Sequence, residues 1–230
     1  SGLLQLRVCI NKHIKQNFLH LILSPEFFYF SEDICHMKNL MKIEFSTLLN
    51  DSNCIKNLET HEYIITSPLI EAEGNFQITC PMKISSSANT LIKCDIIEVF
   101  SNSVSFSNMS FETTIIVDTS NDFTFQDCKI RSTKKFADSV ISIASSQNIL
   151  INRCKITEST DCTGITINFE SLVTIKDSEI SHHPNSLLIC GNRSIVTVKN
   201  CYLHHSEGNG IYWGEEGDIQ IDHCTITDTV

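Results

Sequence analysis

The stretch Ile149-Leu150-Ile151-Asn152-Arg153-Cys154-Lys155-Ile156 decides the fold, because variants of it recur from residue 104 onward. Each variant has two apolar residues separated by one position, and a small or sulfur-containing residue two positions before a third apolar residue. The other copies are VSFSNMSF (104–111), FTFQDCKI (123–130), VTIKDSEI (173–180), VTVKNCYL (196–203) and IQIDHCTI (219–226). Successive small or sulfur positions are 19, 26, 24, 23 and 23 residues apart, which indicates an internal structural repeat.

A second apolar pair precedes most copies, six or seven residues before the next one begins. These pairs are Ile115/Val117, Ile141/Ile143, Ile165/Ile167, Leu187/Ile189 and Ile211/Trp213. Alternation with period two is typical of strands that bury one face, so each repeat is expected to hold two or three short strands. By this alternation Trp213, the only tryptophan, points inward, and we interpret it as a core residue. The alternative is that the glycines of the acidic loop 214–218 displace it outward, where an aromatic ring beside carboxylates would suit sugar recognition.

Asp127, Asp177 and Asn200 stand between consecutive strands of their repeats. Aspartate and asparagine tolerate the left-handed backbone region, so a sharp corner there needs no glycine. A chain that turns two or three times in about 23 residues and then repeats its pattern predicts the stacked coils of a parallel β-helix. A β-propeller, with repeats of about 40 residues, and a left-handed β-helix, with strict hexapeptides, fit the spacing less well.

Residues 97–230 resemble the right-handed parallel β-helix repeats of many polysaccharide lyases and hydrolases. Similar repeats occur in binding proteins such as F-box substrate receptors with β-helix domains and their midbody-associated relatives. The resemblance implies an all-β right-handed solenoid. It says little about function, because the recurring residues are those that fill the core.

We expect residues 1–55 to form an N-terminal cap, mostly helical, and residues 56–230 to form the β-helix, most regular from residue 97. Leu6, Ile10, Ile14, Phe18 and Ile22 form the apolar stripe of an amphipathic helix, which would cover an open solenoid end. A strand at residues 4–10 is the alternative. The chain stops after a complete strand set, so the solenoid is expected to continue in a longer protein.

Composition limits the classes of partner and the cellular locations that fit this chain. The formal charge of −10 disfavours nucleic acid, and no apolar run approaches the roughly 20 residues of a membrane span. The 11 cysteines lack the paired spacing of zinc ribbons and fall about one per repeat, so we expect reduced thiols that pack as small apolar groups. We therefore favour a cytoplasmic location, with secretion as the alternative, and assign no cofactor.

Stacked repeats turn equivalent positions into columns, and one column is rich in groups that could bind or transfer protons. Two positions after the last apolar residue of successive repeats stand Ser132, Glu158, His182, His205 and Asp228. Two histidines between carboxylates could bind a metal or act as general acid and base. The alternative is that they are solvated corner residues, and we assign neither catalytic residues nor metal ligands.

Other outward columns are candidate contact surfaces. Lys129 is predicted to lie next to Lys155, and Lys176 next to Lys199, and adjacent like charges can mark the site of an anionic partner. Exposed lysines also prevent strand edges from aggregating, and Glu179 could neutralise Lys155. A further column, predicted to carry bulky apolar groups outward, contains Ile116, Ser142, Thr166, Leu188 and Tyr212.

Enzymes resembling this fold carry dense acidic motifs: galacturonase-like hydrolases have Asn-x-Asp, Asp-Asp, Gly-His-Gly and Arg-x-Lys on consecutive coils, none of which occurs here. We therefore favour a non-catalytic recognition scaffold that binds a protein or peptide partner. The alternative is a carbohydrate-active enzyme or glycan-binding module that uses the polar corner column on an acidic polysaccharide. A third option is an architectural subunit of a larger assembly.

Overall fold

The computed structural model describes residues 43–50, 52–132, 138–157, 159, 162–214 and 216–229. The predicted capping helix lies outside the described residues. The described part begins with β1 (Ile43–Glu44), the short 3-10 helix η2 (Phe45–Leu48) and β2 (Cys54–Asn57), so the expected boundary after residue 55 falls within β2. No helix among the described residues has the length and apolar character that a bilayer span requires.

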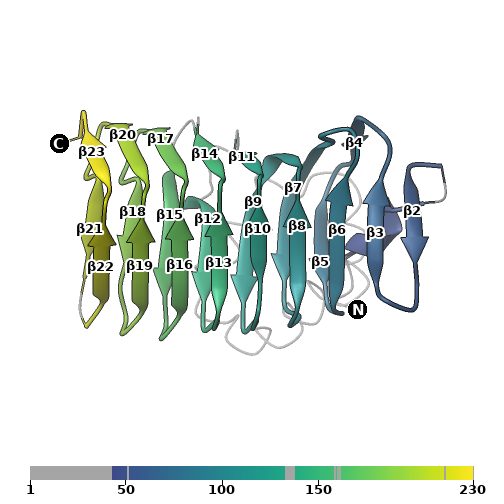
Figure 1. Ribbon diagram of the computed structural model, residues 1–230, viewed down its shortest axis with the longest axis horizontal. Coiled ribbons are helices and arrows are strands. Elements are labelled where there is room, and N and C mark those ends of the chain that lie inside the picture. The colour runs from purple at the N-terminus through teal and green to yellow at the C-terminus, as the bar shows by residue number, and fades with distance from the viewer. Residues whose placement is uncertain are drawn as a thin grey trace, which may run out of the picture. The chain divides into compact units, whose positions relative to one another are not determined.

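The described chain winds into successive coils along one axis, and each coil adds a strand to every face (Figure 1). One face is a nine-stranded sheet in which neighbours pair in parallel, apart from the antiparallel pair β2 and β3. In spatial order its strands are β2, β3 (Glu62–Ile65), β6 (Met82–Ser86), β8 (Val104–Ser107), β10 (Thr124–Gln126), β13 (Ile149–Asn152), β16 (Leu172–Lys176), β19 (Ile195–Lys199) and β22 (Asp218–Asp222).

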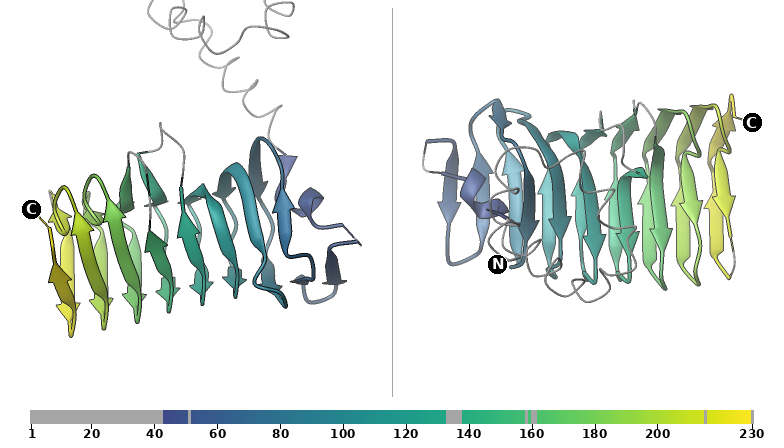
Figure 2. Two further views of the ribbon diagram at one scale, coloured as in Figure 1. Left: turned by 90° about the horizontal axis from the view of Figure 1, so that it is seen from above. Right: turned by 180° about the vertical axis from the view of Figure 1, so that it is seen from behind.

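The second sheet has 14 strands and contains the other two faces. The face opposite the first sheet holds β5 (Asn75–Ile78), β12 (Ser139–Ala144), β15 (Thr163–Asn168), β18 (Leu188–Cys190) and β21 (Ile211–Trp213). The short third face holds β4 (Leu69–Glu71), β11 (Lys129–Arg131), β14 (Lys155–Thr157), β17 (Glu179–His183), β20 (Tyr202–Ser206) and β23 (Thr225–Thr227). The nine-residue strands β7 (Leu91–Val99) and β9 (Ser110–Asp118) run through both of these faces, which joins them into one sheet (Figure 2).

The register of the coils confirms the predicted parallel β-helix. Ile151 pairs with Ile175, and Ile130 pairs with Ile156, so like residues stack along the axis. Their side chains are buried between the sheets, together with a cluster of phenylalanine rings in edge-to-face or stacked contact. This cluster comprises Phe45, Phe106, Phe111, Phe123 and Phe125.

The corners between the first and third faces adopt the left-handed conformation that the sequence predicts. All six residues that precede a small or sulfur position have φ between 49° and 55°: Asn108, Asp127, Arg153, Asp177, Asn200 and His223. Arginine and histidine thus occupy a backbone position that favours asparagine and aspartate. The corner is therefore set by the repeat as a whole and not by one residue type.

The small or sulfur positions form a buried hydrogen-bonded column, and this explains why serine can replace cysteine there. Ser178 Oγ accepts from the N–H of Cys154 at 3.0 Å and donates to the Lys176 carbonyl at 2.7 Å. Cys224 Sγ likewise accepts from the N–H of Cys201 at 3.4 Å. No disulfide joins any two of the nine described cysteines, and burial raises the pKa of Cys201 to about 11, as expected for a packing residue.

Candidate functional site

A groove of about 780 Å³ runs along the edge between the first and third faces. We call it the corner groove. One wall consists of left-handed corner residues, and the other consists of the first residues of the third-face strands. The walls are Asp127, Arg153, Asp177, Asn200 and His223 on one side, and Lys129, Lys155, Glu179, Tyr202 and Thr225 on the other.

Most charged side chains of the corner groove form ion pairs or hydrogen bonds with a side chain of an adjacent coil. Arg153 donates two hydrogen bonds to the Asp127 carboxylate, at 2.7 and 2.8 Å, and thereby holds the pKa of Asp127 below its usual value. Asn200 Nδ2 donates to Asp177 Oδ1 at 3.0 Å. Lys129 makes no ion pair with any described residue, so its ammonium group remains available to a ligand.

Lys155 and Glu179 form the central pair of the groove. Their Nζ and Oε1 atoms are 2.8 Å apart. Partial burial alone would raise the pKa of Glu179, but the hydrogen bond and charge of Lys155, with hydrogen bonds from His204 and Ser181, bring it below its usual value. The carboxylate is therefore ionised at neutral pH.

The described histidines and aspartate of the polar corner column lie next to one another in adjacent coils. The rings of His182 and His205 lie parallel, with centroids 4.8 Å apart, and His205 Nδ1 is 3.9 Å from Asp228 Oδ2. Both histidines are exposed and occupy left-handed corners. Glu158 lies outside the described residues, and Ser132, at the head of the column, is buried instead of solvated.

His204 belongs to the same cluster, although the sequence pattern placed it only beside the column. Its ring is buried, stacks on Tyr202 at a centroid distance of 4.0 Å, and lies edge-on to His182 and His205. His204 Nε2 is 3.3 Å from Glu179 Oε1, and its Nδ1 is 2.5 Å from His205 Nδ1.

An ionised carboxylate can only accept, so Nε2–H of His204 donates to Glu179. A second hydrogen bond joins the Nδ1 atoms of His204 and His205, and the tautomers of the two rings decide which of them donates. The result is a hydrogen-bonded chain across three coils: Lys155, Glu179, His204 and His205. It connects the polar corner column to the wall of the corner groove.

The metal interpretation of the column gains no support from this geometry. Within the described ranges, no group of three or more histidine, cysteine, aspartate or glutamate side chains could hold a metal ion. The arrangement offers hydrogen-bonding groups, an exposed tyrosine ring and one unpaired cation. These are suited to binding a polar ligand along the surface.

A family comparison agrees with the architecture. The family described as "Right handed beta helix region" matches residues 83–230. The chain belongs to this family. Neither the comparison with curated proteins nor that with solved structures gave a match. Membership confirms the all-β, right-handed fold and leaves the ligand of this β-helix to be argued from its surface.

The lysine registers of the β-helix are as predicted. Lys129 pairs with Lys155 and Lys176 with Lys199 in adjacent strands. Glu179 opposes Lys155 directly, and Lys199 Nζ lies 3.5 Å from Asp222 Oδ2. One lysine of each pair, Lys155 or Lys199, is therefore neutralised by a carboxylate of an adjacent coil.

The predicted outward position of Leu188 is wrong. Leu188 pairs with Ile165 and is fully buried, whereas Ile189 takes the outward place between Thr166 and Tyr212. The inward pair of this coil is therefore Leu188 and Cys190. Cys190 lies six residues before Val196, the first residue of the next copy of the motif, as in the other repeats. Tyr212 is 51% exposed and points outward as expected.

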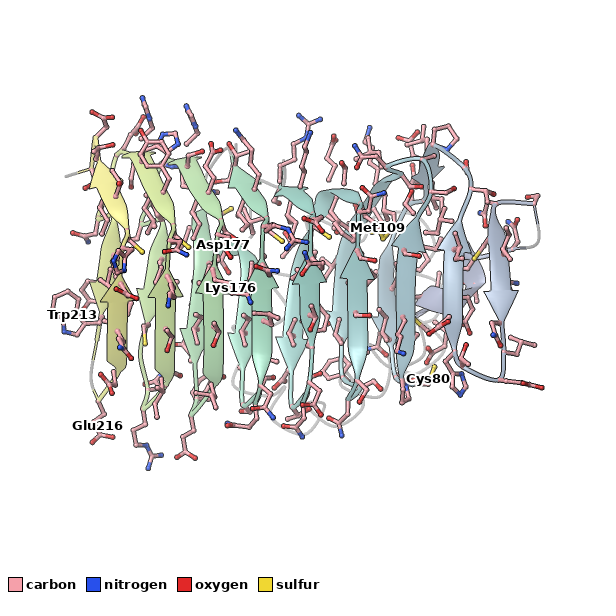
Figure 3. All side chains as sticks on the ribbon, in the orientation of Figure 1. Cys80, Met109, Lys176, Asp177, Trp213 and Glu216 are labelled. Carbon is pink, nitrogen blue, oxygen red and sulfur yellow. The ribbon has the colours of Figure 1, made fainter. Side chains whose placement is uncertain are left out.

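The interpretation of Trp213 as a core residue is also wrong. It stands in register with the buried Cys190, but its side chain is 61% exposed and projects from the end of the described coils (Figure 3). Among the described residues, no further coil packs over it. Alternation alone reports which way a side chain points within a coil, and not whether the next coil covers it.

A second concavity, of about 700 Å³, lies at the corner between β15 and β16 and in the coils beside it. We call it the Phe169 pocket. The exposed ring of Phe169 lines it together with Glu170, Arg193 and Glu216. The repeat pattern did not indicate it, because these residues fall between the repeated strands. An aromatic residue in a turn otherwise rich in serine and asparagine was the available signal.

Proposed function

We propose that this β-helix is a non-catalytic recognition scaffold that binds an extended segment of a protein partner in the corner groove. The observation that carries the proposal is the shape of the groove, whose two walls each receive one side chain from each of five successive coils. Coils repeat about every 4.8 Å, so a straight peptide along the axis would meet a new pair of side chains at each step.

The wall residues indicate the character of the peptide. The unpaired Lys129 suits an acidic side chain, and Tyr202, 43% exposed and backed by the His204 ring, suits an apolar or proline residue. Three coil steps separate Lys129 from Tyr202, or about 14 Å, which an extended peptide covers in about four residues. We therefore expect an acidic and an apolar residue about four positions apart.

Peptide selection followed by affinity measurement tests this proposal. Peptides selected from a random displayed library on the full chain are synthesised and titrated by fluorescence anisotropy against the wild type, Lys129→Glu and Tyr202→Ala. Each groove variant is expected to weaken binding about tenfold, the loss typical of an interface charge or aromatic contact. Lys176→Glu, a like-paired lysine on another face, is the matched control and should keep wild-type affinity. Equal binding by all four proteins would contradict the proposal.

The alternative function is a glycan-binding or carbohydrate-active role through the polar corner column of Glu158, His182, His205 and Asp228. The parallel stack of His182 and His205 beside Asp228 favours it, because such groups can hydrogen-bond sugar hydroxyls and carboxylates. Calorimetry with acidic oligosaccharides and an assay for new reducing ends distinguish the two functions. The double variant His182→Ala/His205→Ala should abolish a glycan signal and leave peptide affinity within about twofold.

A further inference from the structure

The backbone under the Phe169 pocket holds an aromatic residue where another residue type would be more stable. Phe169 and Glu170 have φ of 57° and 60°, both in the left-handed region. The equivalent turn of the next coil has the same shape and uses Asn192 and Arg193, with φ of 51° and 60°. Asparagine tolerates this region and phenylalanine does not, so Phe169 is a strained choice for the turn.

Packing does not compensate for this strain. The Phe169 side chain is 58% exposed, whereas the phenylalanines of the core are fully buried. The turn is held by other groups: Gln147 Nε2 donates to the Glu170 carbonyl at 2.6 Å, and the Glu170 N–H donates to the Asn192 carbonyl at 2.8 Å. A strained, exposed aromatic ring that the fold does not need points to a ligand.

The charges around the ring specify what that ligand carries. Arg193 lies between two carboxylates, with Nη2 2.6 Å from Glu170 Oε1 and Nε 3.4 Å from Glu216 Oε2. The pocket therefore holds two negative charges and one positive charge, on a chain of formal charge −10. The Glu216 side chain is 71% exposed at the end of the described coils (Figure 3), so its carboxylate is accessible to a second cation beside Arg193.

We propose that the Phe169 pocket is a second docking site, separate from the corner groove, that receives an arginine side chain from a protein partner. The planar guanidinium group stacks on the exposed Phe169 ring, as cations do on aromatic faces. Its N–H groups donate to the carboxylates of Glu170 and Glu216, and so neutralise the charge that Arg193 leaves uncompensated. The negative charge of the whole chain attracts such a basic segment at long range.

Titration with a defined peptide, followed by NMR, tests the proposal on the full chain. The probe is acetyl-Gly-Arg-Arg-Gly-amide, and its control is the same peptide with citrulline, which keeps the shape but loses the charge. The arginine peptide is expected to shift the backbone amide signals of residues 168–171 and 191–194, and the citrulline peptide is expected to leave them in place. Phe169→Asn and the double variant Glu170→Gln/Glu216→Gln should each weaken binding about 5- to 20-fold. Phe169→Trp should preserve or strengthen it, because tryptophan has the strongest cation–π interaction.

Two controls separate docking from general attraction and from folding. Phe100→Asn removes an aromatic residue from an equivalent corner without positive φ and should leave the affinity unchanged. Phe169→Asn should raise the melting temperature by about 2–4 °C, because asparagine suits the turn. Shifts spread over the whole surface, equal binding of the citrulline peptide, or a marked loss of stability in Phe169→Asn would each overturn the proposal.

Discussion

At the residue scale, buried hydroxyl groups join one coil to the next. Ser194 Oγ accepts from the N–H of Ser171, and Ser171 Oγ accepts from the N–H of Ser146, both at 3.2 Å. Ser146 Oγ in turn accepts from the N–H of Ser120. These four serines are buried, so each supplies a hydrogen bond that water cannot replace.

Ser194→Ala should therefore lower the free energy of unfolding by about 1–3 kcal/mol, because the Ser171 N–H loses its partner. Urea unfolding followed by circular dichroism measures the change. Ser194→Cys is the matched comparison, since the sulfur column shows that a thiol can fill this role, and it should cost less. An alanine variant as stable as the wild type would show that the ladder contributes nothing.

His183 makes stability depend on pH. It is 1% exposed, its Nδ1 lies 2.8 Å from Ser159 Oγ, and burial lowers its pKa to about 4. Unfolded histidine titrates near pH 6.5, so between pH 6.5 and 4 the unfolded chain binds a proton that the folded chain does not. The contribution of His183 is thus fully present above pH 6.5 and is lost as the pH falls toward 4.

His183→Gln is expected to remove that dependence, worth about 3 kcal/mol between pH 7 and pH 4. Urea unfolding at several pH values gives the difference in stability between the variant and the wild type. This difference should be constant from pH 7 to 8 and should shrink on acidification. A difference that does not change with pH would contradict a buried, neutral His183.

At the element scale, alternating charges cross the third face near its N-terminal end. Lys93 Nζ lies 3.0 Å from Glu71 Oε1 and 3.8 Å from Glu112 Oε1, and Arg131 Nη2 lies 2.7 Å from Glu112 Oε2. Strands β4, β7, β9 and β11 each supply one of these residues. Glu112, only 13% exposed, is the member shared by two cations.

Glu112→Gln should lower stability by about 0.5–1 kcal/mol, the upper range for such ion pairs, because two cations lose their shared carboxylate. The loss should be smaller in 1 M NaCl, which screens the exposed members of the network. Glu62→Gln, which removes a single exposed pair with Lys83, is the control and should have little effect. Chemical unfolding at low and high salt distinguishes these outcomes.

Sequence patterns predicted most of the elements and part of the site. The inward residues of β13 and β16, the left-handed corners at Asp127 and Asn200, and the stack of His182 on His205 all follow from coil register. Leu188 was misplaced because a run of apolar residues at 187–190 fits two registers, and only the corner at Gly191 decides between them.

The Phe169 pocket and the buried His204 could not be predicted, because their contacts depend on rotamers and turn shapes that have no period in the sequence. The exposure of Trp213 could not be predicted either. Its direction follows from alternation, but its exposure depends on what packs over the coil.

At the scale of the whole molecule, each coil contacts mainly the coils on either side, so coils should behave as separable units. Deleting residues 178–200 removes one 23-residue period and joins Asp177 to Cys201 with the corner sequence intact. The shortened chain should fold with the same far-UV circular dichroism signature and a lower melting temperature. Deleting 178–199 instead leaves one extra residue at the corner and should reduce cooperativity sharply, because register is lost. Equal behaviour of both deletions would contradict stacking in register.

The strict division between inward and outward side chains also bears on how such a molecule can change over generations. Positions such as Thr174 and Thr197 contact mainly their outward neighbours, so substitutions there leave the interior untouched. Natural variation can therefore replace the outward residues of one column at a time, while the buried residues stay almost unchanged. Homologous chains should accordingly share buried residues at matching intervals and differ freely in the chemistry that they present to their surroundings.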